Sequence, residues 1–367
     1  MSGKKQRVRD PVHNLIEFEN DTFDRRMWEI LQTRPFQRLR RVRQLGFSEY
    51  VYPGATHSRF AHSLGVFETA RQLMKIIKKH QGAEHYDGDK AKRALAAALV
   101  HDVGHGMFSH AFEEVGKKLA LKMAKHENVS GMLIRDSEIT KILDQFGSGF
   151  ANDVATMVIE QPENLYGAVV SSQFDADRLD YMQRDRMMTG VQNSAIDFKW
   201  LLANIDIAEV RQGVDETAAG TIETFILGPK AMFAADTYVL SLFQLYPTVY
   251  FHKATRAAEK MFTALMIRII TLVQNSEIKK TGLNSVHPIC KFAKKPNDIE
   301  NALNLDDAVF WGALPMLALA KDSCIKKMAE RFQQRKLYKC IDVREQLITK
   351  MNAHLNMKSS ERNEKLK

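Results

Sequence analysis

One apolar segment constrains this chain more than any other. Residues 94–100 read Ala-Leu-Ala-Ala-Ala-Leu-Val and run directly into His101 and Asp102. Small apolar side chains on all sides predict a helix that packs tightly inside the protein. A carboxylate delivered to such a place is costly to bury unless it is paired or bound to a metal. The sequence therefore predicts a buried polar cluster at the end of this helix.

The rest of the chain favours helices. Apolar residues recur with helical spacing from residue 23 onward, and 367 residues include only 9 prolines. Alternating and β-branched residues predict two small hairpins, near 6–18 and 205–226. The predicted fold class is mainly α. We expect helices near 23–44, 62–80, 90–103, 110–124, 151–160, 176–188 and 232–274, with Pro247 interrupting the last.

Three regions are expected along the chain. Residues 1–275 form a helical region that contains both hairpins. A linker rich in turn-forming residues, 283–300, opens a helical C-terminal region over 283–356. Residues 357–367 are mostly charged and polar, so they are expected to form a tail.

Composition and charge exclude several classes of protein. The chain is 45% apolar and 26% charged, which is typical of a globular protein. Its apolar runs fall short of the roughly 20 residues that a membrane span needs, and the basic N-terminus leads into no apolar signal segment. Three widely separated cysteines predict reduced thiols. We expect a cytoplasmic protein with no membrane partner, and the net charge of +9 suits a polyanionic ligand.

Two further segments complete a possible metal site. His62 lies in an apolar stretch that begins at Arg59, and Asp177 lies in the acidic segment 174–181. A lone histidine on an apolar face is more often a core residue than a ligand. Two imidazoles and two carboxylates, however, suit a first-row divalent metal. The spacing of His101 and His105 would also place both on one face of a helix. The metal itself is left open among Mn, Fe, Mg, Co, Ni and Zn.

The order of these residues resembles a known family. His62, His101-Asp102 and Asp177 follow the pattern of the HD-domain metal-dependent phosphohydrolases. More narrowly, the chain is similar to the deoxynucleoside triphosphate (dNTP) triphosphohydrolases, and in particular to the catalytic core of the SAM-and-HD-domain dNTPases. The similarity covers roughly residues 7–275. The segments that carry it include Asp10-Pro-Val-His13, Arg59-Phe-Ala-His62-Ser-Leu-Gly65, His101-Asp-Val-Gly-His105 and Tyr250-Phe-His-Lys253.

The resemblance implies an HD-domain helical fold in which residues 1–275 form the catalytic core, with a metal motif over 59–177. It also implies a set of roles. The reaction would be hydrolysis of a dNTP to deoxynucleoside and tripolyphosphate. The implied metal ligands are His62, His101, Asp102 and Asp177. The implied catalytic residues around the scissile phosphate are His105, His110, His126 and Asp177, with His110 or His126 as the acid. The implied substrate contacts are Gln44, Leu45, Asp185 and Tyr250 at the sugar and Arg59, Arg178 and Tyr181 at the triphosphate.

Some alternatives stay open at this point. Leu242 stands where the family has a further triphosphate arginine, and Arg178 replaces a lysine. The chain could instead hydrolyse nucleoside monophosphates or other phosphoesters, cut single-stranded nucleic acid, or sense nucleotides without catalysis. The family also implies a homo-oligomer. The basic run over 38–43, with four arginines, could bind a regulatory nucleotide or nucleic acid, or could simply be a solvated face.

Overall fold

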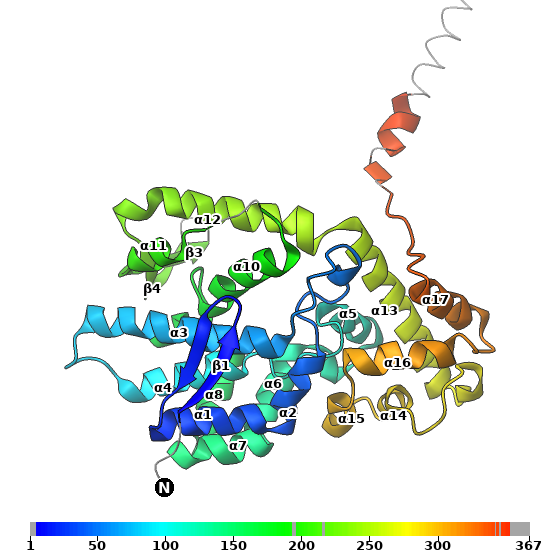
Figure 1. Ribbon diagram of the computed structural model, residues 1–367, viewed down its shortest axis with the longest axis horizontal. Helices are drawn as coiled ribbons and strands as arrows, with labels where there is room; N and C mark the ends of the chain where they lie inside the picture. Colours follow the sequence, from blue (N-terminus) through cyan, green and yellow to red (C-terminus); the bar gives the residue numbers. More distant parts are fainter. Residues whose placement is uncertain (1–4, 193–195, 215–216, 342, 345, 353–367) are drawn as a thin grey trace, which may run out of the picture.

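The computed structural model describes residues 5–192, 196–214, 217–341, 343–344 and 346–352. It is mainly helical, with two separate two-stranded antiparallel sheets (Figure 1). This arrangement confirms the predicted fold class. Among the described helices, none combines the length and the apolar character that a membrane crossing requires.

The first half of the chain builds the frame around the site. Its helices follow an N-terminal hairpin, and residues 39–58, between the second and third helices, include two 3₁₀ turns. The elements are β1 (Gln6–Asp10), β2 (Asn14–Phe18), α1 (Thr22–Gln32), α2 (Arg34–Arg38), α3 (Arg59–Gln81), α4 (Gly88–Val100), α5 (His110–Leu119), α6 (His126–Arg135), α7 (Glu138–Leu143), α8 (Phe150–Ile159), α9 (Leu165–Ala168) and α10 (Ala176–Thr189).

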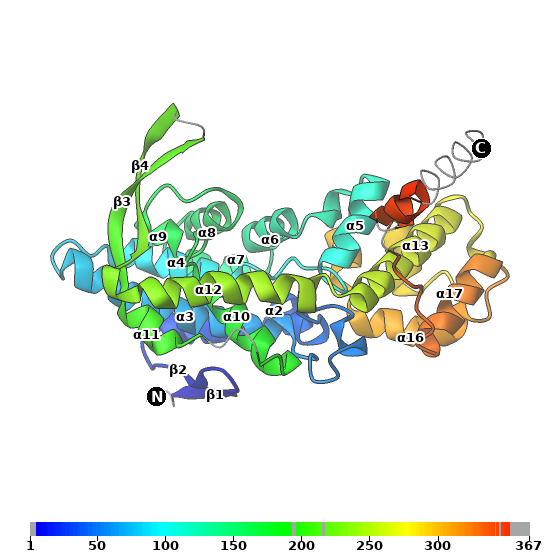
Figure 2. The same cartoon turned by 90° about the horizontal axis from the view of Figure 1, so that it is seen from above.

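The second half adds a projecting hairpin and the C-terminal helices. In Figure 2 the strands β3 and β4 extend away from the helical body. The elements are α11 (Phe198–Ala203), β3 (Ile205–Val214), β4 (Thr217–Leu227), α12 (Met232–Leu245), the π-helical turn η6 (Tyr246–Tyr250), α13 (Lys253–Gln274), α14 (Pro288–Lys294), α15 (Ile299–Leu303), α16 (Asp307–Leu317) and α17 (Ser323–Gln333).

Both predicted hairpins are present. In the first, β1 pairs with β2 from Gln6↔Phe18 to Asp10↔Asn14. Its inner side chain Phe18 is buried and stacks on Phe67 of α3, with 5.5 Å between ring centroids. The second pairs β3 with β4 from residue 205 to residue 227. The first hairpin is therefore fixed against the central helix.

Helix α3 crosses the middle of the molecule and packs against both α4 and α10 (Figure 1). It begins after Ser58, whose side chain caps the helix by accepting a hydrogen bond from the backbone N–H of Ala61. The alanines of α4 that face it, including Ala94 and Ala98, are fully buried. The expectation of a buried alanine-rich helix is confirmed, and the small side chains let α4 lie close to its neighbours.

Two long helices expected from the sequence are divided. The segment 23–44 breaks at Thr33, which is extended, and a new helix starts with Pro35 in its first turn. Proline has no backbone N–H to continue the earlier helix but is well tolerated at a helix start. The segment 232–274 is interrupted at the turn that contains Pro247, as expected.

The expectation of a linker over 283–300 is wrong. This segment contains α14, whose Ile289, Cys290 and Phe292 are fully buried. They belong to the same apolar core as α3 and α13. Turn-forming residues at 283–288 and 295–298 mark the ends of a short helix there, and an apolar face lies between them. The tail expected over 357–367 lies entirely, like residues 353–356, outside the described residues.

Candidate active site

The four expected metal ligands come together from three packed elements. His62 lies on α3, His101 and Asp102 follow the last residue of α4, and Asp177 lies in the first turn of α10. His62 Nε2 is 2.9 Å from Asp177 Oδ1 and 3.8 Å from Asp102 Oδ2. His101 Nε2 is 3.3 Å from Asp102 Oδ1 and 3.9 Å from Asp177 Oδ1. The two imidazoles and two carboxylates thus converge on one point.

The donor set fits a divalent metal ion. Ligand atoms of His62, His101 and Asp102 lie within 4.8 Å of one another. The buried Nε2 atom of His101 has no hydrogen-bond partner among the described residues, which leaves its lone pair free for an ion. Burial by itself lowers the pKa of His62, but Asp177 and Asp180 raise it to about 10. A metal would therefore have to displace a proton from this imidazole.

Arg59 is bound to the metal-site carboxylate. It lies in the first turn of α3, and its Nη1 donates to Asp102 Oδ2 at 2.5 Å, while Nε donates to Ser109 Oγ at 2.7 Å. Burial raises the pKa of Asp102, but Arg59 and the adjacent imidazoles outweigh it and hold this pKa well below its usual range. Asp102 therefore stays ionised, as a metal ligand must be.

The loop after α4 departs from the expected helix. The helix ends at Val100, so His101 and His105 do not share a helical face as the spacing predicted. Gly104 allows this loop to touch α6, because a Cβ there would lie 2.2 Å from the backbone N of Ser130. Farther on, Ser109 adopts a left-handed φ of 54°, a conformation that costs energy and often marks functional sites.

A group of three histidines lies beside the metal site. His105 stacks on His126, with 3.7 Å between ring centroids. Burial lowers the pKa of His105 well below its usual value, helped by Arg59 and His126, so this imidazole is neutral. Glu113 contacts both other rings: its Oε2 lies 3.3 Å from His110 Nδ1, and its Oε1 pairs with His126 Nδ1. The expected catalytic histidines are thus neighbours.

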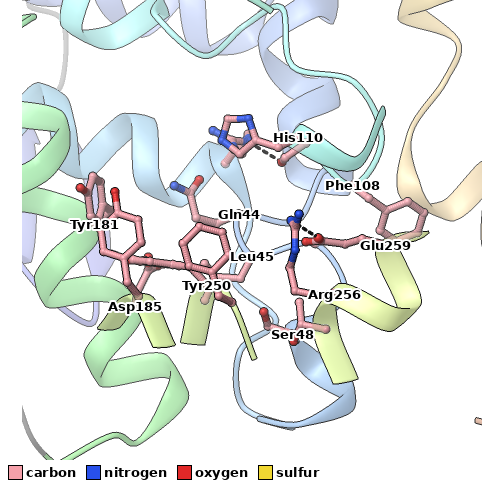
Figure 3. A pocket seen from close by; sticks show the side chains of 16 residues that line it. Gln44, Leu45, Ser48, Phe108, His110, Tyr181, Asp185, Tyr250, Arg256 and Glu259 are labelled. Atoms are coloured by element: carbon pink, nitrogen blue, oxygen red, sulfur yellow. Dashed lines mark hydrogen bonds and ion pairs between the residues drawn. The ribbon is translucent and has the colours of Figure 1, made fainter. Parts of the chain in front are cut away.

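All but one of the expected sugar and phosphate contacts line one cavity (Figure 3). Its volume is about 420 Å³, within the size range of small-molecule sites. The expected residues that line it are Gln44, Leu45, Arg59, His110, Tyr181, Asp185 and Tyr250. Arg178 does not line it; this side chain lies half-exposed with Nε 3.4 Å from Asp175 Oδ2.

Residues that the sequence did not single out line the cavity or support its walls. Asp185 accepts hydrogen bonds from the buried His57 Nε2 at 2.8 Å and from the Tyr250 hydroxyl at 2.9 Å, which fixes its carboxylate. On another wall, Arg256 pairs with Glu259 at 2.6 Å (Figure 3). Sequence reasoning missed His57, although it lies only five residues before His62.

Asp180 is a second residue that was missed. It lies on α10, fully buried, and accepts a hydrogen bond from His62 Nδ1 at 2.8 Å. Burial raises the pKa of Asp180, but Arg184, His13 and His62 hold it well below its usual range. The only signal in the sequence was its place beside Tyr181.

The four arginines of the basic run over 38–43 do not form one continuous basic surface. Arg38 is buried and donates to three backbone carbonyls, and burial lowers its pKa to about 10. Arg41 and Arg43 are engaged with an aspartate and with a backbone carbonyl. Arg40 lies over the ring of Phe60, 3.6 Å from its centroid. Most of this run stabilises the fold.

Comparisons with known proteins agree with this geometry. The HD domain family model matches residues 59–188. The chain is 32% identical over 335 residues to the uncharacterized protein YwfO of Bacillus subtilis, covering 91% of this chain and 71% of that protein. It is 28% identical over 296 residues to the deoxynucleoside triphosphate triphosphohydrolase SAMHD1 of Mus musculus, covering 71% of this chain and 43% of that protein.

A solved structure is similar over almost the whole chain. It is the crystal structure of a phosphohydrolase from Bacteroides thetaiotaomicron, with 25% identity and a TM-score of 0.74. The match covers 96% of this chain and 84% of that one. Sequence, fold and the converging His and Asp side chains agree: this chain belongs to the HD-domain family of dNTPase-like phosphohydrolases.

Proposed function

We propose that this phosphohydrolase cleaves dNTPs to deoxynucleoside and tripolyphosphate. The observation that carries the proposal is the cavity beside the metal ligands. Its volume of about 420 Å³ suits one nucleotide, and it brings Gln44, Leu45, Asp185 and Tyr250 to one place. A single-strand nuclease would need a groove that continues past the reacting nucleotide.

Different residues of the chain hold the metal, donate the proton and bind the sugar. A divalent ion held by the four ligands would supply Lewis-acid activation of phosphate and water. His110 lines the cavity and is oriented by Glu113, so it is our candidate to protonate the departing 5′-oxygen. Asp185 and Tyr250 hold the 3′-hydroxyl, while the apolar side chain of Leu45 leaves a 2′-hydroxyl without a partner.

A second candidate keeps the fold and changes the substrate. Leu242 is apolar, and Arg178 does not line the cavity. Neither residue therefore neutralises the outer phosphates of a triphosphate in this cavity. This favours a nucleoside monophosphate or another phosphoester as the alternative substrate. Homo-oligomer formation, nucleotide regulation and a cytoplasmic location stay predictions.

Product analysis tests the proposal. The protein is incubated with dNTPs, NTPs and dNMPs in ¹⁸O-labelled water with Mn²⁺, and the products are separated by chromatography. We expect deoxynucleoside and tripolyphosphate, with the label in tripolyphosphate. Release of orthophosphate with dNDP, or turnover of monophosphates alone, would contradict it.

A double substitution connects the activity to the metal ligands. His101→Ala with Asp102→Ala removes two of four ligands, so bound metal and hydrolysis should both be lost. The matched control is Glu84→Ala with His85→Ala, an adjacent acid and histidine pair that is exposed on the surface. The control should retain both properties, as measured by elemental analysis and by the product assay.

A further inference from the structure

Asp180 is the centre of a fully buried polar network. Besides accepting from His62, its carboxylate accepts from His13 Nε2 at 2.7 Å and from Arg184 Nε and Nη2 at 2.8 and 2.9 Å. Both Asp180 and Arg184 are completely inaccessible to solvent. The carboxylate that contacts a metal ligand is therefore itself held by two other side chains.

The network extends to the N-terminal hairpin. Arg184 donates from Nη1 to Asp10 Oδ2 at 2.8 Å and from Nη2 to Asp10 Oδ1 at 3.3 Å. Asp10 is the last residue of β1, and it also accepts from the backbone N–H groups of Val12 and His13, both at 2.9 Å. The turn of the hairpin is thus tied to α10 by side chains that are far apart in sequence.

A glycine on α3 provides the room for this network. A Cβ at Gly65 would lie 1.9 Å from Asp180 Oδ1 and 2.2 Å from Arg184 Nη2. Nothing larger than hydrogen fits there unless the charged pair moves. The helix that carries His62 therefore has a gap one turn away that Asp180 and Arg184 occupy.

The charges around the site leave room for a divalent cation. With the ligand histidines neutral, as metal ligands must be, four carboxylates face two guanidiniums, so the net charge of these six groups is −2. An ion of charge +2 would balance it. The charged groups are Asp10, Asp102, Asp177, Asp180, Arg59 and Arg184.

We propose that Asp180 is a positioning residue for the metal, and that the hairpin turn acts on metal affinity through it. Asp180 accepts the Nδ1–H of His62, which fixes the tautomer that leaves the Nε2 lone pair pointing to the other ligands. His13 and Arg184 in turn fix the Asp180 carboxylate. His13, which is no ligand, therefore affects how tightly the ion is held.

Metal titration of the full chain tests this proposal. Mn²⁺ binding is measured by calorimetry, without substrate, for the wild type and two sets of variants. Asp180→Asn should weaken binding roughly 10- to 100-fold, the usual effect of losing such a partner. His13→Leu should weaken it less, and His13→Gln should restore most of the loss because its amide can donate where Nε2 does.

Asp24→Asn is the matched control. Asp24 is also a buried carboxylate paired with an arginine, Arg71, at 2.6 Å, but it belongs to the contact between α1 and α3 and not to the metal network. It should lower the melting temperature without weakening Mn²⁺ binding. Equal loss of affinity in Asp24→Asn and Asp180→Asn would show a general effect of destabilisation and would overturn the proposal.

Two other outcomes would also overturn it: wild-type affinity in Asp180→Asn, or no difference between His13→Leu and His13→Gln. If Asp180→Asn does not fold, the comparison of His13→Leu with His13→Gln decides alone, because His13 lies in the hairpin turn, at the end of the network. The readout is independent of substrate, so failure of the dNTPase proposal would leave this result intact.

Discussion

The two sides of the site hold their side chains in different ways. On the side of α3 and α10, His62 is fully buried and fixed through Asp180. On the side of α5, the His110 side chain is 70% exposed and contacts Glu113 at 3.3 Å. The first side is preorganised for an ion, whereas the second can adjust when a substrate enters the cavity. Metal binding and catalysis should therefore respond to different substitutions.

The largest effect is expected at the buried side. Gly65→Ala would place a Cβ within 1.9 Å of Asp180 Oδ1. Overpacking of this kind costs about 1–3 kcal/mol or more of stability, and here it must also displace the partner of His62. We expect loss of bound metal and of activity, together with a lower melting temperature, as measured by elemental analysis and calorimetry.

Gly88→Ala provides the control for that substitution. Gly88 is the first residue of α4, and a Cβ there would meet no atom within 4 Å. Metal content and activity should be unchanged. If Gly65→Ala keeps its metal and activity as Gly88→Ala does, the side of the site formed by α3 and α10 is not tightly packed around Asp180.

The next effect is expected at the open side. His110→Ala removes the candidate acid and should slow turnover by roughly 100- to 10,000-fold. Because His110 is exposed and lies outside the buried network, metal affinity and melting temperature should stay near those of the wild type. Turnover and Mn²⁺ titration measure the two properties separately. Loss of metal affinity in His110→Ala would contradict the expectation that metal binding and catalysis respond to different substitutions.

Removal of the metal should destabilise the elements on the α3 and α10 side of the site more than the C-terminal helices. A ligand present at 100 times its Kd stabilises the folded state by about 2.7 kcal/mol, and a chelator would remove that amount. Hydrogen exchange should then accelerate in β1, β2 and α10 but not in α14–α17. Uniform acceleration over the chain would show that the ion stabilises the whole fold equally.

The smallest effect is expected in the sugar pocket. The wild type should prefer dATP over ATP, because a buried 2′-hydroxyl without a partner costs about 1–3 kcal/mol. Leu45→Ala should reduce this preference by about tenfold, which corresponds to 1.36 kcal/mol, mainly by admitting ATP. Leu319→Ala, at a leucine that is 81% exposed, is the control for kcat/KM. Equal wild-type rates on dATP and ATP would show that this pocket does not select against the 2′-hydroxyl.

Local patterns predicted much of this molecule. Periodicity located most of the helices up to residue 189, and the alanine-rich run before His101 and Asp102 pointed to the buried cluster of His and Asp side chains that could hold a metal. These signals lie within short windows of sequence. The C-terminal helix α14 was missed because prolines and polar residues at its ends obscure a single apolar turn.

The residues that hold the candidate metal ligands in place could not be predicted in the same way. His13 and Asp180 are 167 residues apart, and no local pattern links them. The burial of Arg38 likewise depends on backbone carbonyls of distant segments. Spacing reveals which residues share a helical face, but the partner of a buried charge is set by the tertiary fold.

The hairpin turn has a consequence for the order of folding. The contact between Asp10 and Arg184 closes a loop of more than 170 residues, and contacts of this length form late because closing them costs chain entropy. The complete ion site should therefore appear near the end of folding. Interactions absent from the transition state slow unfolding and leave the folding rate unchanged. Added Mn²⁺ should accordingly lengthen the lifetime of the native state without speeding its formation.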